Sequence, residues 1–307
     1  MAGDANYASV SLLLHGDGAN ASTTFTDNSP TPKTPTVNGN AQISTAQSKF
    51  GGASIKLDGA GDYITYADSA DFAFGTGDFT VECWFYESAT GAIRQIVGQH
   101  STASLTNTSF IILSDSGKLS FSANYGSVSV VAANASTHTG SAWHHVAGVR
   151  DGTNIRLYLD GVHIASAAIG TNTVNNSTRP LCIGTVMNDT GREPAGYDFN
   201  GYIDDLRISK GVARYTGTGS FTPPAQAHPN GIGEVAGVVY DDTGTPCART
   251  VRAYRRDTGA LIGSTTSDAG TGAYLITTPT LDEVQRIVLD DNAGTLYNDL
   301  IDRVIPA

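Results

Sequence analysis

The sequence predicts an all-β protein of two β-sandwich domains, a larger one followed by a smaller one. Two features of the chain lead to this prediction. Charged residues make up only 15% of the 307 residues, below the roughly 25% of an average globular protein, and Gly is abundant. Apolar and polar residues alternate with a period of two over many short runs, whereas the 3.6-residue period of an amphipathic helix is almost absent. Short strands joined by tight turns explain both features.

The larger domain is predicted from a series of alternating runs, each bounded by turn residues. Asp115-Ser116-Gly117 separates two of these runs and predicts a β-hairpin, and Asp151-Gly152 predicts a second one. Strands at such close intervals are typical of a sandwich or jelly roll. The predicted strands cover residues 53–57, 63–66, 79–86, 110–113, 118–122, 143–150 and 155–159.

A proline-rich stretch divides the chain. Three prolines fall between Phe221 and Gly231, and proline cannot donate a hydrogen bond to a strand ladder. We therefore expect a domain over residues 1–223, a linker over 224–233 and a small β-sandwich over 234–307. The smaller domain is predicted from further apolar runs at residues 235–240, 250–255, 261–265, 274–278 and 286–289.

Charge and cysteine content exclude several functional classes. The formal net charge of −11 gives no basic footprint for a nucleic-acid backbone, and no segment approaches the roughly 18 apolar residues of a membrane helix. Nucleic acid and membrane are therefore not expected as partners. Cys83, Cys182 and Cys247 are odd in number and far apart, which predicts three reduced thiols and no disulfide framework. No C-x-x-C pair suggests zinc.

Several motifs in order resemble a known family. The segments LLLHGDG, KFGGASIKLDGAGDYI, GDFTVECWFY, WHHVAGVRDG, IRLYLDG and FNGYIDDLRIS are similar to the laminin-G-like branch of the concanavalin A-like jelly rolls, over residues 8 to 223. The variant with AQISTAQSKFGG and RISKGVARY is similar to domains of tailed-phage virion proteins. The resemblance implies a concanavalin A-like (laminin-G-like) jelly-roll sandwich. The smaller domain, with VAGVVYDDTGTP and SDAGTGAY, resembles transthyretin-like or carboxypeptidase-regulatory-like sandwiches.

A glycosidase is not expected, although some members of this superfamily are glycosidases. Such enzymes need two carboxylates that face one groove, and they resemble each other in a strand with the pattern E-x-D-x-x-E or E-x-D-x-E. Glu82 and Glu87 have the longer spacing, but Trp84 occupies the position of the central Asp. Residues five apart on a regular strand also point to opposite faces. We interpret the two glutamates as rim charges and expect no enzymatic activity.

Calcium is the ion that the resemblance suggests, because relatives of this kind bind it at the rim of the sandwich. A calcium site needs six to eight oxygen ligands, and no EF-hand loop is present. Asp followed by Gly is also an ordinary turn signature, so the same residues have a purely structural alternative. The candidate ligands are Asp17, Asp27, Asp58, Asp62 and Asp204. Asp204 also lies close to Arg207, and a partly buried Asp–Arg pair that fixes strand register is the alternative there.

Glycan binding would use aromatic side chains on loops. Trp84 and Trp143 lie within strong strands and are expected in the core. The surface candidates, which lie in loop-like stretches, are Tyr125, His138 and Tyr197.

The resemblance to tailed-phage proteins, together with the lack of a catalytic motif, implies a non-enzymatic bacteriophage virion protein, as a tail fibre, a tail tip or a capsid decoration. Its laminin-G-like domain would face outward and bind a surface or a glycan. The expected partners are other virion proteins, further copies of this chain in a homo-oligomer or repeated array, and a host-surface glycan. The protein would be made in the host cytoplasm and reside on the tail or capsid surface. The alternative is a bacterial carbohydrate-binding or adhesion module outside any virion.

Overall fold

The computed structural model divides into two compact units. It describes residues 4–133, 137–188, 191–193, 196–231, 233–241, 243–255, 259, 261–278, 284–289 and 299–304. The jelly-roll unit comprises Ser9–His228, and the second unit, called the C-terminal unit, comprises Pro229–Ala307 with Met1–Ala8. The break between them falls inside the stretch 224–233 that we expected to be a linker. Residues 224–228 belong to the jelly-roll unit, where His228 is buried.

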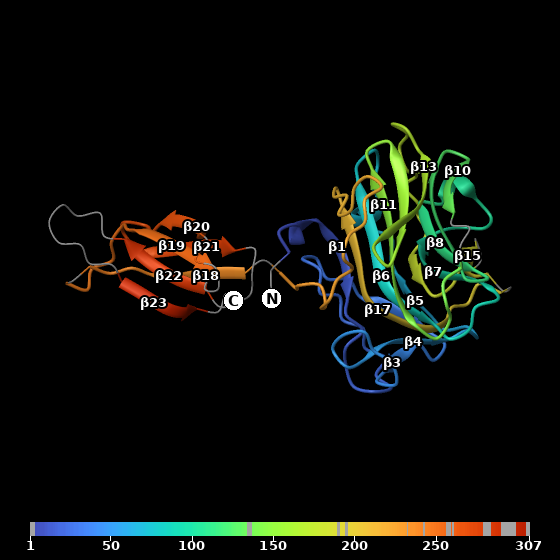
Figure 1. Ribbon diagram of the computed structural model, residues 1–307, viewed down its shortest axis with the longest axis horizontal. Coiled ribbons are helices and arrows are strands. Elements are labelled where there is room, and N and C mark those ends of the chain that lie inside the picture. The colour runs from blue at the N-terminus through green and yellow to red at the C-terminus, as the bar shows by residue number, and fades with distance from the viewer. Residues whose placement is uncertain are drawn as a thin grey trace. The chain divides into compact units, whose positions relative to one another are not determined.

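One layer of the jelly-roll unit is a mostly antiparallel sheet of eight strands among the described residues (Figure 1). Its strand order is β13-β12-β11-β6-β17-β4-β3, and β1 pairs with β17 beside this path. The strands are β1 (Val10–Leu14), β3 (Gln42–Ser44), β4 (Ser54–Asp58), β6 (Phe79–Glu87), β11 (Trp143–Asp151), β12 (Asn154–Leu159), β13 (Val162–Ala168) and β17 (Asn200–Lys210).

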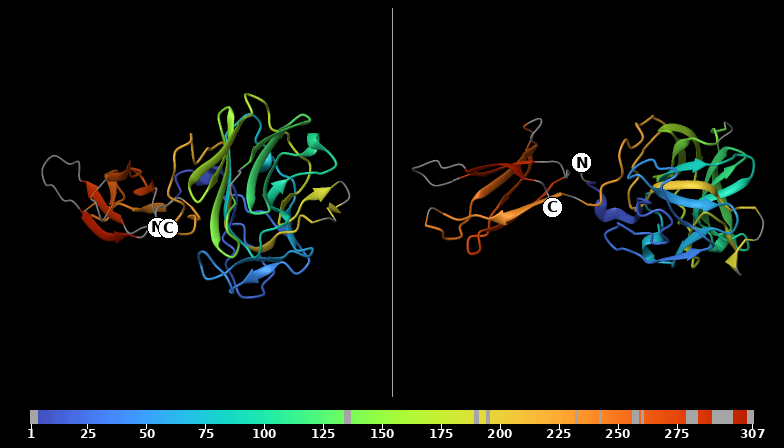
Figure 2. Two further views of the ribbon diagram at one scale, coloured as in Figure 1. Left: turned by 45° about the vertical axis from the view of Figure 1, so that its right-hand side comes forward. Right: turned by 90° about the horizontal axis from the view of Figure 1, so that it is seen from below.

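The second layer faces the first and has seven strands in the described part of the chain, in the order β10-β9-β8-β7-β14-β5-β2. The views in Figure 2 show the two layers of this unit from other directions. The strands are β2 (Pro35–Asn38), β5 (Tyr63–Tyr66), β7 (Ile93–Gln99), β8 (Phe110–Asp115), β9 (Lys118–Tyr125), β10 (Val128–Ala133) and β14 (Leu181–Ile183). A small ribbon, β15 (Met187–Asn188) with β16 (Gly191–Arg192), and two short 3-10 helices, η2 (Ala70–Phe72) and η3 (Leu105–Asn107), complete the unit. A further 3-10 helix, η1 (Tyr7–Ser9), spans the boundary between the two units in the sequence.

Alternation along the strands builds the core between the two layers. In β6, Val81, Cys83 and Phe85 point inward and are fully buried with side chains of the facing sheet, such as Phe110 and Phe121. Both predicted hairpins are present, with β8 paired to β9 and β11 paired to β12. The all-β, concanavalin A-like prediction is therefore confirmed.

Residues 211–228 cross the outer face of the eight-stranded sheet, and we call this segment the strap. Tyr215 and Phe221 of the strap stack with ring centroids 3.6 Å apart, and they pack on Tyr158 of β12. The Phe221 amide donates to the carbonyl of Gly161 at 2.8 Å. The strap therefore closes a second, smaller apolar cluster on the side of the sheet that faces away from the main core.

The C-terminal unit contains two further sheets among the described residues. β18 (Gly233–Val238) pairs with β21 (Ala273–Thr278), and the other sheet has the order β20-β19-β22-β23. The latter strands are β19 (Thr250–Arg255), β20 (Leu261–Thr266), β22 (Val284–Leu289) and β23 (Asp299–Val304). Much of the predicted domain 234–307 beyond residue 278 lies outside the described residues. The transthyretin-like resemblance of this unit stays a prediction.

All three cysteines are free, and two of them are buried. Burial raises the pKa of the Cys182 thiol to about 12, so it reacts slowly as a thiolate. We predict that a reducing agent leaves the melting temperature unchanged, because no covalent cross-link is lost. Thermal melting with and without dithiothreitol measures this, and a clear fall of the melting temperature in the presence of the reductant would contradict it.

No helix of the described residues is long and apolar enough to cross a membrane.

Candidate functional site

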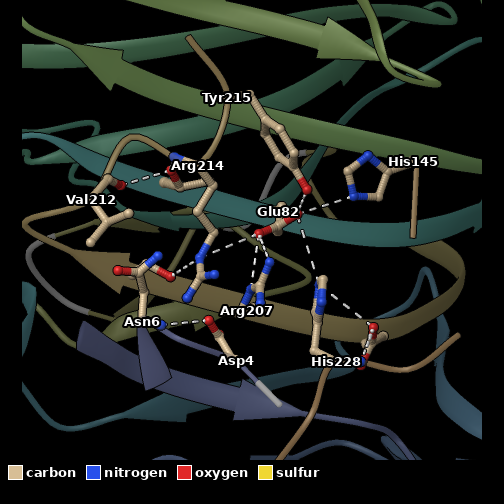
Figure 3. A network of polar contacts seen from close by, with 12 residues as sticks. Asp4, Asn6, Glu82, His145, Arg207, Val212, Arg214, Tyr215 and His228 are labelled. Atoms are coloured by element: carbon tan, nitrogen blue, oxygen red, sulfur yellow. Dashed lines mark hydrogen bonds and ion pairs between the residues drawn. The ribbon is translucent and has the colours of Figure 1, made fainter. Parts of the chain in front are cut away.

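Glu82, one of the two candidate glycosidase carboxylates, lies in a buried polar network on the outer face of β6 (Figure 3). Arg207 of β17 donates to its Oε1 through Nε at 3.0 Å and Nη2 at 2.7 Å. The Tyr215 hydroxyl of the strap donates to Oε2 at 2.6 Å, and His145 Nε2 lies 3.3 Å from the same atom. Burial alone raises the pKa of Glu82, but the Arg207 guanidinium holds the pKa well below its usual value.

This network is structural. Glu82 is fully buried, and its lowered pKa favours the ionised form, which the surrounding arginine and tyrosine donors stabilise. The sequence interpretation of Glu82 as a rim charge was wrong, because the strap covers the outer face of the sheet at this position. The expected Asp–Arg pair at Arg207 was also wrong, since Arg207 pairs with Glu82 across the β6–β17 ladder. The sequence alone gave no sign of the strap that seals the network.

Glu87, the second candidate, points between the sheets at the end of β6. Its Oε2 accepts from the Ser114 hydroxyl at 2.8 Å and lies 2.9 Å from His138 Nε2, while Arg94 Nε lies 3.2 Å from Oε1. Arg94 and Ser114 belong to β7 and β8 of the seven-stranded sheet, whereas the partners of Glu82 lie on the outer face. The two glutamates therefore lie on opposite faces of β6, as their spacing predicts.

A pocket of about 480 Å³ that combines charged side chains with small residues opens at one end of the jelly roll, next to this Glu87 cluster. Three separate segments build it: the β4–β5 turn, the start of β7 and the connection that precedes β17. A pocket of this volume is large enough for a small sugar unit. The residues that line it are Gly59, Ala60, Ala92, Arg94, Arg192, Gly196 and Asp198.

Asp198 organises the pocket. Its Oδ2 accepts from the Gly61 amide at 3.0 Å and from Arg192 Nη1, and its Oδ1 accepts from the Thr185 hydroxyl at 2.6 Å. Arg94 Nη1 donates to the backbone carbonyl of Asp198 at 3.0 Å. One residue thus orients both guanidinium groups. The side chain of Arg192 is 33% exposed and that of Arg94 is 14% exposed, so both can reach a ligand.

Gly59 allows the close packing of the pocket wall. It has φ +79, and a Cβ atom there would lie 2.7 Å from Asn200 Cβ and 3.3 Å from Arg94 Nη1. A side chain at this position would displace Arg94 and strain the turn. The Asp58-Gly59 turn signal of the sequence therefore has a second consequence, because it also shapes the pocket.

The predicted glycan-binding residues are not brought together. His138 is buried against Glu87, so its expected position at the surface was wrong: the loop that carries it folds back under Gly117, whose carbonyl accepts from the His138 amide. Tyr125 is half-buried and packs against the core. Tyr197 is half-buried between two residues that line the pocket, Gly196 and Asp198. The pocket arginines were not predicted as site residues. Basic residues are scarce in this acidic chain, and this scarcity was the signal that could have indicated them.

The five aspartates predicted as calcium ligands separate into different places. Asp27 is saturated, because it accepts from the amides of Leu13, Ser29 and Lys33 and from the Ser29 hydroxyl. Only Asp58 and Asp62 form a close pair, at the β4–β5 turn. Asp62 also accepts hydrogen bonds from the Asn40 and Asp58 amides. Burial raises the pKa of Asp62, and the charge of Asp58 raises it further.

Asp17 and Asp204 lie in a second acidic region. Asp204 is fully buried, and its Oδ2 accepts from the amides of Lys49 and Phe50 at 2.7 and 3.1 Å. Burial raises its pKa to about 7. Asp17 packs against Gly51 and influences Asp204 through charge alone. Among the described residues, no group of three or more His, Cys, Asp or Glu side chains could hold a metal ion, so the predicted ligand set does not assemble into one site.

Comparison with solved structures shows a similar fold in toxin binding domains. The binding domain of Paraclostridial Mosquitocidal Protein 1 aligns with a TM-score of 0.51 and 15% identity, over 96% of this chain and 76% of that chain. The binding domain of botulinum neurotoxin serotype D/C aligns with a TM-score of 0.51 and 15% identity, over 98% of this chain and 70% of that chain. The botulinum neurotoxin DC binding domain solved with rat synaptotagmin II aligns with a TM-score of 0.50 and 16% identity, over the same shares.

Identities this low show similarity of fold alone. A search of curated protein sequences found no significant match. A family model is more informative: residues 58–214, just over half of the chain, match Laminin_G_3, described as the concanavalin A-like lectin/glucanases superfamily. The matched region lies within the jelly-roll unit and contains every residue that lines the pocket. This chain belongs to the Laminin_G_3 family of the concanavalin A-like lectin/glucanases superfamily.

Proposed function

We propose that this chain is a non-enzymatic bacteriophage virion protein, a tail fibre, tail tip or capsid decoration, whose jelly roll binds a saccharide on the host surface. The observation that carries the binding role is the pocket around Arg94, Arg192 and Asp198 at the end of a lectin-type sandwich. Arginine, aspartate and glycine in a concave polar site provide the hydrogen bonds that sugar hydroxyl and acidic groups require.

The carboxylates of the molecule support binding over hydrolysis. A glycosidase needs two carboxyl groups that face one substrate, about 5 to 9.5 Å apart. Glu82 and Glu87 lie on opposite faces of β6, and both are buried and ion-paired. Asp198, the carboxylate that lines the pocket, already accepts three hydrogen bonds. A reducing-sugar release assay is expected to give no product.

The virion part of the proposal comes from the sequence motifs similar to tailed-phage proteins. A single shallow site binds a sugar weakly, and repetition on a symmetric particle would increase the avidity of the whole assembly. Immunogold labelling of purified particles with an antibody to this chain tests the location. Label on tails or capsids supports the proposal, whereas detection only on bacterial cells would favour the alternative of a bacterial carbohydrate-binding or adhesion module.

The saccharide-binding role is tested with a glycan array and then with isothermal titration calorimetry on the best ligand. We expect binding that is lost in Arg192→Gln, because this partly exposed side chain lines the pocket. Arg156→Gln is the matched control, since Arg156 pairs with Asp151 on β11 and does not line the pocket. A protein that binds no saccharide, or one that binds equally well without Arg192, would contradict the proposed site.

Calcium also stays a proposal, based on the family resemblance. Asp58 and Asp62 are the predicted ligands that lie together, and further oxygens would have to come from carbonyl groups and water. We expect millimolar calcium to raise the melting temperature relative to chelator, by mass action on the folded state. Asp62→Asn should remove this shift and Asp17→Asn should retain it. Identical melting curves in calcium and chelator would remove the ion from the proposal.

A further inference from the structure

We infer that the pocket recognises the carboxylate of an acidic sugar residue, which the guanidinium groups of Arg94 and Arg192 hold together. The inference rests on the proposed saccharide-binding function and names its ligand class. Three features of the pocket favour such a ligand: the hydrogen-bond donors that remain available, the contacts that hold the two arginines, and the small residues that line the remaining wall.

The side chains that line the pocket offer more unused donors than unused acceptors. Both oxygens of Asp198 already accept hydrogen bonds from Gly61, Arg192 and Thr185. In the described part of the chain, Arg94 Nη2 and the Nε and Nη2 groups of Arg192 make no hydrogen bond to protein. A neutral sugar hydroxyl both donates and accepts, whereas a carboxylate only accepts. The remaining side-chain capacity therefore matches a carboxylate better than a hydroxyl.

Both guanidinium groups are held in place by contacts with other residues of the protein. Arg94 is fixed by the buried Glu87 carboxylate and by the Asp198 carbonyl, and Arg192 is fixed by the Asp198 carboxylate. These partners leave each planar group in a defined orientation before a ligand arrives. Arginine binds carboxylates through two parallel N–H donors, and an ordered arginine loses little side-chain entropy on binding.

The pocket leaves space between the arginines for a sugar ring. Gly59 and Gly196 line it without side chains, and Ala60 and Ala92 contribute only methyl groups. Each arginine already pairs with a carboxylate, Arg94 with Glu87 and Arg192 with Asp198, so a ligand carboxylate would bind through the remaining N–H donors and not through a net positive charge. The net charge of −11 repels long polyanions from the surface. A short saccharide that carries one carboxylate fits these conditions better than a nucleic acid or a highly sulfated polymer.

The test uses the full-length chain and three matched ligands: a short oligosaccharide ending in glucuronic acid, its methyl ester, and the same oligosaccharide ending in glucose. Calorimetry should give a dissociation constant about tenfold or more tighter for the acid than for the ester, since charge-assisted hydrogen bonds are stronger than neutral ones. Arg192→Gln should abolish this preference. Arg192→Lys should restore part of it, because lysine retains the charge and lacks the two-pronged geometry. Arg156→Gln should leave the preference unchanged.

The other outcomes separate the inference from the function on which it rests. Equal binding of acid, ester and glucose forms, lost in Arg192→Gln, would overturn the carboxylate inference and leave saccharide binding intact. Failure of any oligosaccharide to bind would overturn both. Inorganic phosphate that competes at the same concentration as the acid sugar would show an oxyanion site without sugar recognition, and this would also overturn the inference. Melting curves of each variant confirm that the fold is retained.

Discussion

Replacing Arg207 by methionine is expected to lower the free energy of unfolding by about 3–5 kcal/mol. The substitution removes the two donors that neutralise Glu82, which is fully buried beneath the strap. An ionised carboxylate that loses its nearest cation is costly in this environment, because the lowered pKa of Glu82 depends mainly on Arg207 and the remaining Arg214 Nε lies as far as 4.0 Å from Oε1. Urea denaturation followed by tryptophan fluorescence measures the loss.

A double variant distinguishes the charge effect from a general packing defect. Glu82→Met together with Arg207→Met removes both charges and retains apolar volume, so it should lose less stability than the sum of the two single variants. The Tyr215 hydroxyl would lose its acceptor in that background, and Tyr215→Phe added to it should then cost little. Additive losses in the single and double variants would contradict a tightly coupled network.

Asp204→Asn is expected to stabilise the protein increasingly between about pH 4 and 7, by on the order of 4 kcal/mol at pH 7 and above. Burial raises the pKa of Asp204 to about 7, with further contributions from the Asp205 and Asp17 charges. A carboxyl group with a raised folded-state pKa stabilises the protein fully below its unfolded pKa near 4, and this contribution is lost as pH rises through 7. Asparagine mimics the protonated form and can still accept from the Lys49 and Phe50 amides.

The comparison of wild type and Asp204→Asn at two pH values isolates this group from other titrating side chains. Near pH 4 the two proteins should have similar stability, and the difference should grow between about pH 4 and 7 and stay constant above pH 7. Asp27→Asn is the matched control, because Asp27 is also buried and accepts four hydrogen bonds. A constant difference between wild type and Asp204→Asn across the pH range would show that Asp204 is ionised in the folded state at all of these pH values.

Alternation along the chain predicts the central strands well, because burial on one face imposes a strict period of two. The run at 79–86 corresponds to β6 (Phe79–Glu87), and the run at 143–150 corresponds to β11 (Trp143–Asp151). β7 lies in the interior of its sheet and was nevertheless missed, and edge strands were missed as well. β13 lies at the edge of its sheet and is only partly buried, so its sequence, VHIASAA, carries little apolar alternation. A strand that packs weakly and on one side only has no clear alternation of apolar and polar residues in its sequence.

Irregular backbone explains much of what the sequence could not predict. Asp205 has φ +50, and the register of β17 against β6 shifts between Asp204 and Arg207. This bulge places Arg207 beside Glu82, which simple alternation cannot indicate. The strap has no repeated pattern at all, and its position depends on separate contacts such as Phe221 with Gly161. The linker prediction therefore included residues that complete the jelly roll.

The pocket was not predicted because its residues are far apart in the sequence. Arg94 and Arg192 are about a hundred positions apart, and only the pairing of the two sheets brings them to one end of the unit. Aromatic residues were predicted as glycan-binding residues because sugars stack on them, yet Tyr125 packs against the core. Two arginines on separate strands, β7 and β16, of an acidic chain were a weaker but better signal, since guanidinium groups recognise acidic ligands.

The most direct test of the binding site is a crystal structure of the protein soaked with the short glucuronic acid oligosaccharide. The ligand is expected in the pocket between Arg94 and Arg192, with its carboxylate oxygens about 3 Å from guanidinium nitrogens of both residues. Gly59 should remain in contact with the sugar ring, because its missing side chain leaves room there. A saccharide bound elsewhere on the jelly roll, or one whose carboxylate points into solvent, would contradict the proposed site.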